Sequence, residues 1–385
     1  MSAGVRLSEV SDLVMGQSPS SASYNDVGEG LPFYQGKSEF GTMYPTPKKF
    51  CTAPKKIAEA GDILISVRAP VGATNLCAER SCIGRGIAAI RPRGINRDFL
   101  YFYLKKIESY IDSLGTGVIF KAINKSQLSN LLINKAGISL TEQKKIAHVL
   151  STVQRAIEAQ ENIIQTTTEL KKVLMHKLFT EGTRGEPRKE TEIGLIPESW
   201  EICSIPDSLV RSQVGRQNQI PSKAIADSGQ YPVVDQGQLL VSGYTDESDR
   251  LIDFDLPLII FGDHTRRFKF VDFPFVIGAD GTKVLKPDLE LFEPKYFFYA
   301  LDLLDLPSRG YNRHFKMLQE RKVPKPVMDE QRDIASMIDT VEQKLIVAES
   351  KRMIIQDLFR TFLHSLMTAR TCIHGFEAPK IKETP

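Results

Sequence analysis

Two stretches of the chain carry apolar residues at alternating spacings of three and four positions over many helical turns. The first, from Thr141 to Phe179, contains no proline or glycine, and the second begins at Asp329. This spacing lines the apolar residues along one stripe and predicts two α-helices, each about 55 Å long at 1.5 Å per residue. Such long helices pack against each other rather than into a domain core. The alternative is a coiled coil that only joins two chains.

Outside these helices the apolar runs are short and are bounded by glycine, proline and aspartate, which is typical of buried strands. Two longer apolar segments carry aromatic residues on one face and predict helices. Together they indicate two mixed domains that precede the two long helices. The predicted strands are 61–67, 86–92, 256–262 and 281–287, and the predicted helices are 99–114 and 296–304.

The chain contains an internal repeat, which is the feature that organises all the others. The stretch TEQKKIAHVL at 141–150 reappears as DEQRDIASMI at 329–338, which pairs Gln143 with Gln331, 188 positions later. Upstream the separation is 195 and pairs Gly86 with Gly281. The same separation of 195 pairs Phe120 and Lys121 with Phe315 and Lys316, and smaller matches pair His176 with His364 and Gln35 with Gln236.

The repeat and the composition predict six segments in an α+β fold with a pseudo-two-fold axis. They are a first mixed domain at 1–140, a long helix at 141–180, a charged linker at 181–192, a second mixed domain at 193–328, a second long helix at 329–370 and a tail at 371–385.

Composition narrows the class of protein without identifying it. The 385 residues are enough for two cores, and 42% hydrophobic and 25% charged residues are ordinary for a globular protein. No apolar run approaches the 18 residues of a membrane span, so we expect a cytoplasmic protein with no membrane partner. The five cysteines are scattered, which argues against zinc and for reduced thiols. A net charge of +3 permits nucleic-acid binding only through local patches.

Catalytic motifs are missing from the sequence, which contains no HExxH, GxSxG or metal-spaced histidine cluster. His176 and His364 are expected to be helix-end or packing residues, and Asp62 a turn or cap residue. The chain has no Pro-Pro pair and therefore lacks the tetrapeptides with which amino-methyltransferases present a flipped base. We expect no catalysis and no metal in this chain.

Basic loops with interleaved aromatic and amide residues are the remaining chemical signal. The loops 115–125 and 308–316 contain no acid, and we place both at corresponding points of the repeat. Arginine reads guanine, asparagine and glutamine read adenine, and lysine holds phosphate, so these loops predict DNA contacts. The alternative for any single residue is a solvated charge. The candidates are Tyr34, Gln35, Lys37, Arg68, Arg85, Lys121, Asn124, Lys125, His264, Arg266, Arg267, Lys269, Lys283, Arg309, Tyr311, Asn312, Arg313, His314 and Lys316.

With these parts in place, the chain resembles the specificity subunit of a Type I restriction–modification system. The stretch EIGLIPESWEI at 192–202 resembles the opening of a second target-recognition domain, and LMHKLFTEG at 174–182 resembles the end of a first spacer helix. One departure is that the first domain begins VRLSEV, without the tryptophan that Trp200 supplies in the second.

The resemblance implies a non-catalytic reader of double-stranded DNA with a bipartite site. Each target-recognition domain is expected to bind one half of the site in the major groove, and two antiparallel helices are expected to set the spacing. The implied partners are two methyltransferase subunits and the restriction subunits. S-adenosylmethionine, ATP and magnesium are expected on those partners, and no cofactor is expected in this chain. The alternatives are the specificity subunit of a related system that cuts on both sides of its site, and a coiled-coil adaptor that binds no DNA.

Overall fold

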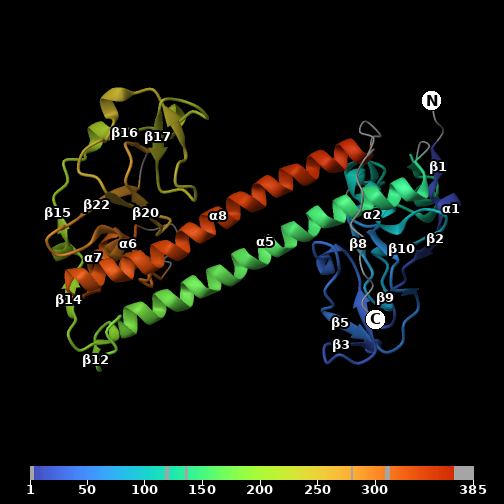
Figure 1. Ribbon diagram of the computed structural model, residues 1–385, viewed down its shortest axis with the longest axis horizontal. Coiled ribbons are helices and arrows are strands. Elements are labelled where there is room, and N and C mark those ends of the chain that lie inside the picture. The colour runs from blue at the N-terminus through green and yellow to red at the C-terminus, as the bar shows by residue number, and fades with distance from the viewer. Residues whose placement is uncertain (1–3, 118–120, 135–137, 279–280, 308–312, 368–385) are drawn as a thin grey trace. The chain divides into compact units, whose positions relative to one another are not determined.

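The computed structural model describes residues 4–117, 121–134, 138–278, 281–307 and 313–367 (Figure 1). The chain divides into two compact units. One comprises the residues up to Ile163 and those from Ala348 onward, and the other comprises Ile164–Val347. Each unit holds one mixed domain and part of each of two long helices, α5 (Leu140–Glu181) and α8 (Met328–Met367). The predicted α+β fold with two repeated domains is therefore confirmed.

The domain of the first unit is built from short strands and four short helices. Its elements are β1 (Val5–Arg6), α1 (Leu7–Val10), β2 (Ser11–Met15), β3 (Tyr24–Asn25), β4 (Leu31–Tyr34), β5 (Lys49–Cys51), β6 (Ile57–Ala58), β7 (Ile63–Ser66), β8 (Thr74–Leu76), β9 (Ser81–Ile83), β10 (Ile87–Pro92), α2 (Arg97–Lys106), α3 (Glu108–Ser113), α4 (Lys125–Ser129) and β11 (Leu132–Ile133).

The domain of the second unit follows the same plan. Its elements are β12 (Arg188–Thr191), β13 (Gly194–Pro197), β14 (Glu201–Ser204), β15 (Leu209–Val210), β16 (Gln219–Ile220), β17 (Tyr231–Val234), β18 (Gly243–Thr245), β19 (Leu258–Gly262), β20 (Phe268–Val271), β21 (Val276–Gly278), β22 (Thr282–Pro287), α6 (Pro294–Asp302), α7 (Phe315–Gln319) and β23 (Lys322–Lys325).

The internal repeat is visible in the sheet topology. An antiparallel sheet has the order β2-β10-β7-β8 in the first unit and β15-β22-β19-β20 in the second. A second sheet contains β5-β4-β9 in one unit and β18-β17-β21 in the other. The pair β4–β9 in the first unit and the corresponding pair β17–β21 in the second unit are both parallel. The two domains are therefore two copies of one fold, and the four predicted strands correspond to β7, β10, β19 and β22.

The core of each domain lies between its antiparallel sheet and the aromatic face of one helix. All four residues of β7 are buried, as apolar residues on both faces of a strand predict. Helix α2 buries Phe99, Tyr101 and Phe102. The segment predicted as one helix, 99–114, is two helices, because the backbone leaves the helical conformation at Ile107 (φ −97°, ψ 15°). This turn brings Ile111 of α3 into the same core as α2.

The glutamine of the repeated motif attaches each long helix to its domain. Gln143 is buried, and its Oε1 accepts the backbone N–H of Asn96 at 2.9 Å, at the start of α2. Gln331 does the same with the N–H of Glu293, at the start of α6, at 2.8 Å. Helix starts leave backbone donors without partners inside the helix, so a buried amide that accepts one there fixes the two helices together. This shared role explains why the motif is present twice.

The linker predicted at 181–192 is more ordered than expected. Its second half forms β12, which pairs with β13 as an antiparallel hairpin, with Arg188 opposite Pro197. The hairpin places Ile196 in the second unit's core beside Phe179 of α5. Strand pairing and one buried apolar residue therefore override the high charge of this segment.

Helices α5 and α8 run antiparallel in the second unit. Lys171 Nζ lies 2.8 Å from Glu342 Oε2, and the backbone N–H of Thr183 donates to Glu330 Oε1 at 2.9 Å. Residues later in α5 therefore lie beside residues earlier in α8, as an antiparallel pair requires. In the first unit, Ile157 of α5 and Phe359 of α8 belong to one core. None of the helices in the described ranges has the length and hydropathy that crossing a bilayer requires.

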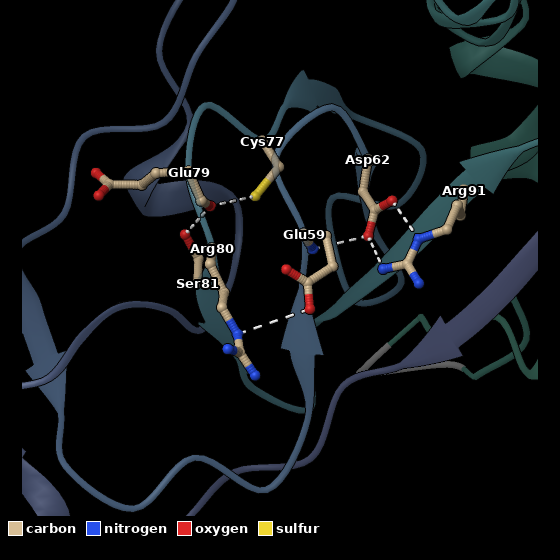
Figure 2. A network of polar contacts seen from close by, with 7 residues as sticks. All are labelled: Glu59, Asp62, Cys77, Glu79, Arg80, Ser81 and Arg91. Atoms are coloured by element: carbon tan, nitrogen blue, oxygen red, sulfur yellow. Dashed lines mark hydrogen bonds and ion pairs between the residues drawn. The ribbon is translucent and has the colours of Figure 1, made fainter.

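A polar network closes the end of the first domain where β7 begins (Figure 2). Asp62 Oδ1 and Oδ2 accept hydrogen bonds from Arg91 Nε and Nη2 at 2.9 and 2.8 Å, and Oδ2 also accepts the Glu59 N–H. Asp62 is buried, so this two-point pair fixes the register of β7 on β10. Asp62 is therefore a turn and register residue, as the sequence predicts. In the second unit Lys286, the repeat counterpart of Arg91, pairs with Asp255 at 2.6 Å.

Candidate nucleic-acid interface

The candidate residues of the first unit gather where several strands of its two sheets reach one edge. Ser66 at the end of β7 lies opposite Ile87 at the start of β10, and Tyr34 of β4 lies beside Ile83 of β9. The next residues along the chain therefore share an edge, which we call the loop edge of the first unit. It carries Gln35, Arg68 and Arg85.

In each unit one glycine allows two chain segments of the loop edge to pack closely together. A Cβ atom on Gly86 would lie 2.3 Å from the carbonyl oxygen of Gln35, a distance that no side chain tolerates. Gly281 has φ +83°, and a Cβ there would lie 2.8 Å from Nε2 of Gln236. The glycine and glutamine pairs found in the repeat are thus one structural feature, a glutamine segment packed against the glycine that precedes β10 or β22.

The cations of this first edge differ in how far they are engaged. Arg68 and Arg85 are exposed, and neither side chain forms an ion pair with any residue in the described ranges. Lys121 is brought beside Arg68 because the Ala69 N–H donates to its carbonyl oxygen. Its ammonium lies 3.0 Å from Asp112, an exposed pair that contributes little to stability. Lys37 lies 3.7 Å from Glu108.

Asn124 has a structural role that limits its use as a base-reading amide. Its Oδ1 accepts the N–H of Gln127, and the Gln127 side chain accepts the N–H of Asn124, which forms a capping box at the start of α4. Lys125 follows it as the first residue of α4 and is exposed.

The second unit builds the corresponding loop edge from the ends of β17, β19 and β21 and the start of β22. Gln236 Oε1 accepts the backbone N–H of His264 at 3.2 Å, which joins the first two of these segments. Lys283 near the start of β22 holds its ammonium 5.6 Å from the centre of the Phe315 ring. The start of α7 therefore reaches this edge as well.

A buried carboxylate fixes α7 to this edge, and no pattern in the sequence singled it out. Asp263 Oδ1 accepts the backbone N–H groups of both His314 and Phe315 at 2.7 Å. The His314 ring, also buried, places Nδ1 2.9 Å from the Asp263 carbonyl oxygen. The carboxylate thus serves as the cap that His314 itself does not provide. His314 is therefore a packing residue rather than the DNA contact that the sequence predicts.

Two further candidates are corrected by their burial. Tyr34 is 2% exposed and packs in the core beside Cys77; burial raises the pKa of its hydroxyl to about 12. Lys269 is 7% exposed and forms an ion pair with Asp235 at 3.5 Å, and burial lowers the pKa of its ammonium. Lys269 takes an inward position in the alternation of β20, whereas Tyr34 lies on β4, where it and the two residues before it are all buried.

The other cations of the second edge remain candidates. Arg267, Arg313 and Lys316 are exposed. Arg266 donates from Nη1 to the Leu306 carbonyl oxygen at 2.5 Å, so its guanidinium is partly occupied. Arg309, Tyr311 and Asn312 lie outside the described residues.

The alignment of Phe120-Lys121 with Phe315-Lys316 is wrong. The equivalent short helices are α4 and α7, whose preceding cap residues are Asn124 and His314. Leu128 and Leu318 then occupy the same buried place, each donating its N–H to the carbonyl oxygen of the cap residue. The sequences of the two helices share only this leucine. The matching Phe-Lys pairs were a more conspicuous similarity, but they do not mark equivalent positions.

The two edges offer cations, amides and backbone groups, which suit a polyanion with readable edges. Within the parts of the chain that the structure describes, no cluster of three histidine, cysteine, aspartate or glutamate side chains is placed to hold a metal ion.

Comparison with known proteins gives a consistent picture. A family model described as "Type I restriction modification DNA specificity domain" matches twice, over residues 3–168 and 197–354. The chain is 43% identical over 170 residues to a putative specificity subunit of the type I restriction enzyme MjaX of Methanocaldococcus jannaschii. That match covers 44% of this chain and 40% of the relative.

Two longer similarities extend over most of the chain. The specificity subunit of the enzyme MjaVIII from the same organism is 24% identical over 71% of this chain and 69% of its own length. The crystal structure of a Type I restriction–modification S subunit from M. genitalium matches 94% of this chain and 95% of its own with a TM-score of 0.69. At 18% sequence identity, this last similarity is one of fold.

Proposed function

The chain belongs to the family of Type I restriction modification DNA specificity domains, and on this premise we propose that it recognises a bipartite DNA sequence, one half with each unit. The observation that carries the proposal is the repeated loop edge. Both units bring a glutamine segment, a glycine turn and exposed cations to one edge of the same fold. Cations with no protein partner are what phosphate and guanine require.

We further propose that the chain reads DNA without catalysing a reaction and works with methyltransferase and restriction subunits. Long helices that continue from one unit into the other support a fixed spacing between the two half-sites. Two repeated units in one chain also suit a partner that is present in two copies related by a two-fold axis.

The test of this function is recognition itself. The chain, co-expressed with the methyltransferase encoded beside it, is expected to direct adenine methylation at one bipartite sequence, mapped across a genome. Purified complex is expected to protect two separated half-sites, with an affinity that falls steeply as salt rises. A coiled-coil adaptor would give neither result, and the absence of any DNA binding in the complex would refute the proposal.

Arginines of the two edges are expected to act on different halves of the site. Arg85→Ala is expected to weaken the half-site bound by the first unit and Arg313→Ala the other, each by about ten- to a hundredfold, since a good base contact is worth about 1–3 kcal/mol. Binding to oligonucleotides with one randomised half measures this.

Arg93→Ala is the matched control for Arg85→Ala. Arg93 is an exposed arginine beyond the opposite end of β10, paired with Asp12 at 3.0 Å. Its removal changes net charge equally but leaves the loop edge intact, so the preference for bases is expected to persist. If Arg85→Ala and Arg313→Ala relaxed the same half-site, the assignment of one half to each unit would be wrong.

The outward faces of the long helices are the proposed docking surface for the methyltransferase. Leu170 on α5 is 55% exposed, and Leu358, 188 positions later on α8, is 42% exposed. Large apolar side chains left in solvent mark partner surfaces, and equivalent positions in a repeat suit two identical partners.

Each leucine is expected to hold one partner copy. Leu170→Glu and Leu358→Glu should each lower the number of bound methyltransferase subunits from two to one, and the double variant from two to none, by native mass spectrometry. Thr168→Glu adds the same charge on another face of α5 and should retain both copies. Two copies bound to the double variant would refute this surface.

A further inference from the structure

An exposed pair of leucines stands at the loop edge of the second unit, and its role deepens the DNA recognition proposed above, on which this inference rests. Leu239 is 71% exposed and Leu240 is 45% exposed, both on the loop between β17 and β18. Two adjacent large apolar side chains in solvent are unfavourable unless a partner covers them.

A buried lysine holds the loop that carries these leucines. The ammonium of Lys269 donates to the carbonyl oxygen of Leu239 and pairs with Asp235. Asp235 Oδ1 in turn accepts the N–H of Gly237 at 2.8 Å. Thr265 Oγ1 donates to the Gln236 carbonyl oxygen at 2.7 Å. The leucine pair is therefore presented by a braced turn, whose Gln236 and Leu239 carbonyl oxygens are bonded to the neighbouring strand and turn.

The surroundings of the leucine pair are cationic. The segment that braces the loop continues into the exposed Arg267, and Asp263 ties the same segment to Arg313 and Lys316. Asp235 and Asp263, which lie on the same segments, are both occupied by protein partners. An apolar tip inside a cationic rim matches a groove of DNA, where phosphates border the base edges.

The major groove offers one apolar group at its base edges, the C5-methyl group of thymine, and apolar side chains contact it directly. We propose that Leu239 and Leu240 read thymine methyl groups in the half-site bound by the second unit. In the counterpart loop of the first unit, Ser38 and Glu39 stand at the positions of Leu239 and Leu240. The test below therefore compares the two half-sites.

The test removes only the methyl groups. Each thymine of the mapped site is replaced by deoxyuridine, one half-site at a time, and binding of the full chain with its methyltransferase is measured. In the half-site read by the second unit, loss of a buried methyl is expected to weaken binding by about three- to fivefold per contacted thymine. The Leu239→Ala, Leu240→Ala double variant is expected to bind thymine and deoxyuridine oligonucleotides equally.

Gln238→Ala, an exposed neighbour in the same loop, is the control and should retain the preference for thymine. Unchanged hydrogen exchange in the second unit of the double variant shows that this unit is folded. The inference is overturned if that half-site contains no thymine, if deoxyuridine binds the unaltered protein equally well, or if the double variant keeps the preference. Failure of the unaltered protein to bind any bipartite site would instead refute the proposed function, and this inference with it.

Discussion

Glu330→Ala is expected to lower the free energy of unfolding of the second unit by roughly 3 kcal/mol. Glu330 is buried at the start of α8, and its carboxylate holds three parts of the unit together. Oε1 accepts the Thr183 N–H at 2.9 Å and the Thr183 hydroxyl at 3.1 Å, just beyond α5. Oε2 accepts the indole N–H of Trp200 at 3.1 Å.

The size of the effect follows from what alanine leaves behind. The indole N–H of the buried Trp200 would lose its acceptor without gaining water, and an unpaired buried donor costs about 1–3 kcal/mol. The part-buried hydrogen bonds of Thr183 to Glu330 would be lost as well. The ion pair with Arg184 at 3.4 Å adds little because that guanidinium is half exposed. Glu330→Gln keeps one carbonyl oxygen and is expected to cost about half as much.

The repeat supplies the control for this prediction. Glu142 occupies the same place in the repeated motif, but it is exposed and its carboxylate accepts the N–H and hydroxyl of Ser139. Glu142→Ala is expected to cost less than about 1 kcal/mol, the value of a helix cap. Hydrogen exchange resolved by unit measures both changes. Equal losses in the two units would show that Glu330 is not the junction we describe.

Removing residues 163–169 from α5 together with 344–350 from α8 is expected to shorten the spacer between half-sites by about three base pairs. The two deletions keep the antiparallel register set by Lys171 with Glu342, because equal lengths are lost from facing segments. Seven residues correspond to about 10 Å of helix, and each base pair to about 3.4 Å of duplex.

The affinity for the original site is expected to fall at least about tenfold in this variant, since two shortened helices cannot restore the lost length. Selection from a library of sites with different spacers identifies the new optimum. Replacing 163–169 by other helix-forming residues keeps the length and should keep the spacer. Deleting the segment from α5 alone breaks the register and should abolish binding. An unchanged spacer after the matched deletions would refute the proposed spacing role.

The long helices and the buried strands could be predicted from sequence because their signals are local. Periodic apolar residues mark α5 and α8, and apolar runs between glycine and proline mark β7 and β19. The break between α2 and α3 carries no such signal, since it depends on how Ile111 packs. The hairpin β12–β13 was hidden by charged residues whose side chains point to solvent.

The candidate site was predicted less well, because residue types alone do not show whether a side chain points into solvent or into the core. Arg68, Arg85 and Arg313 are exposed, whereas Tyr34 and His314 are buried. No local sequence feature distinguishes the exposed residues from the buried ones. Asp263 escaped notice for a related reason: its repeat counterpart is Arg68, and a cap contributed from a distant strand leaves no trace beside the helix it serves.

The close packing of Gln35 on the glycine turn has a consequence for how such a protein changes over time. The turn is held by backbone atoms and by the absence of a side chain at Gly86, whereas the side chain at position 85 points into solvent. Residues at the reading positions can therefore be exchanged with little effect on folding. Since each unit has its own glycine, the two halves of the proposed target can diverge separately, and new sequence preferences would arise by recombining halves that are already stable.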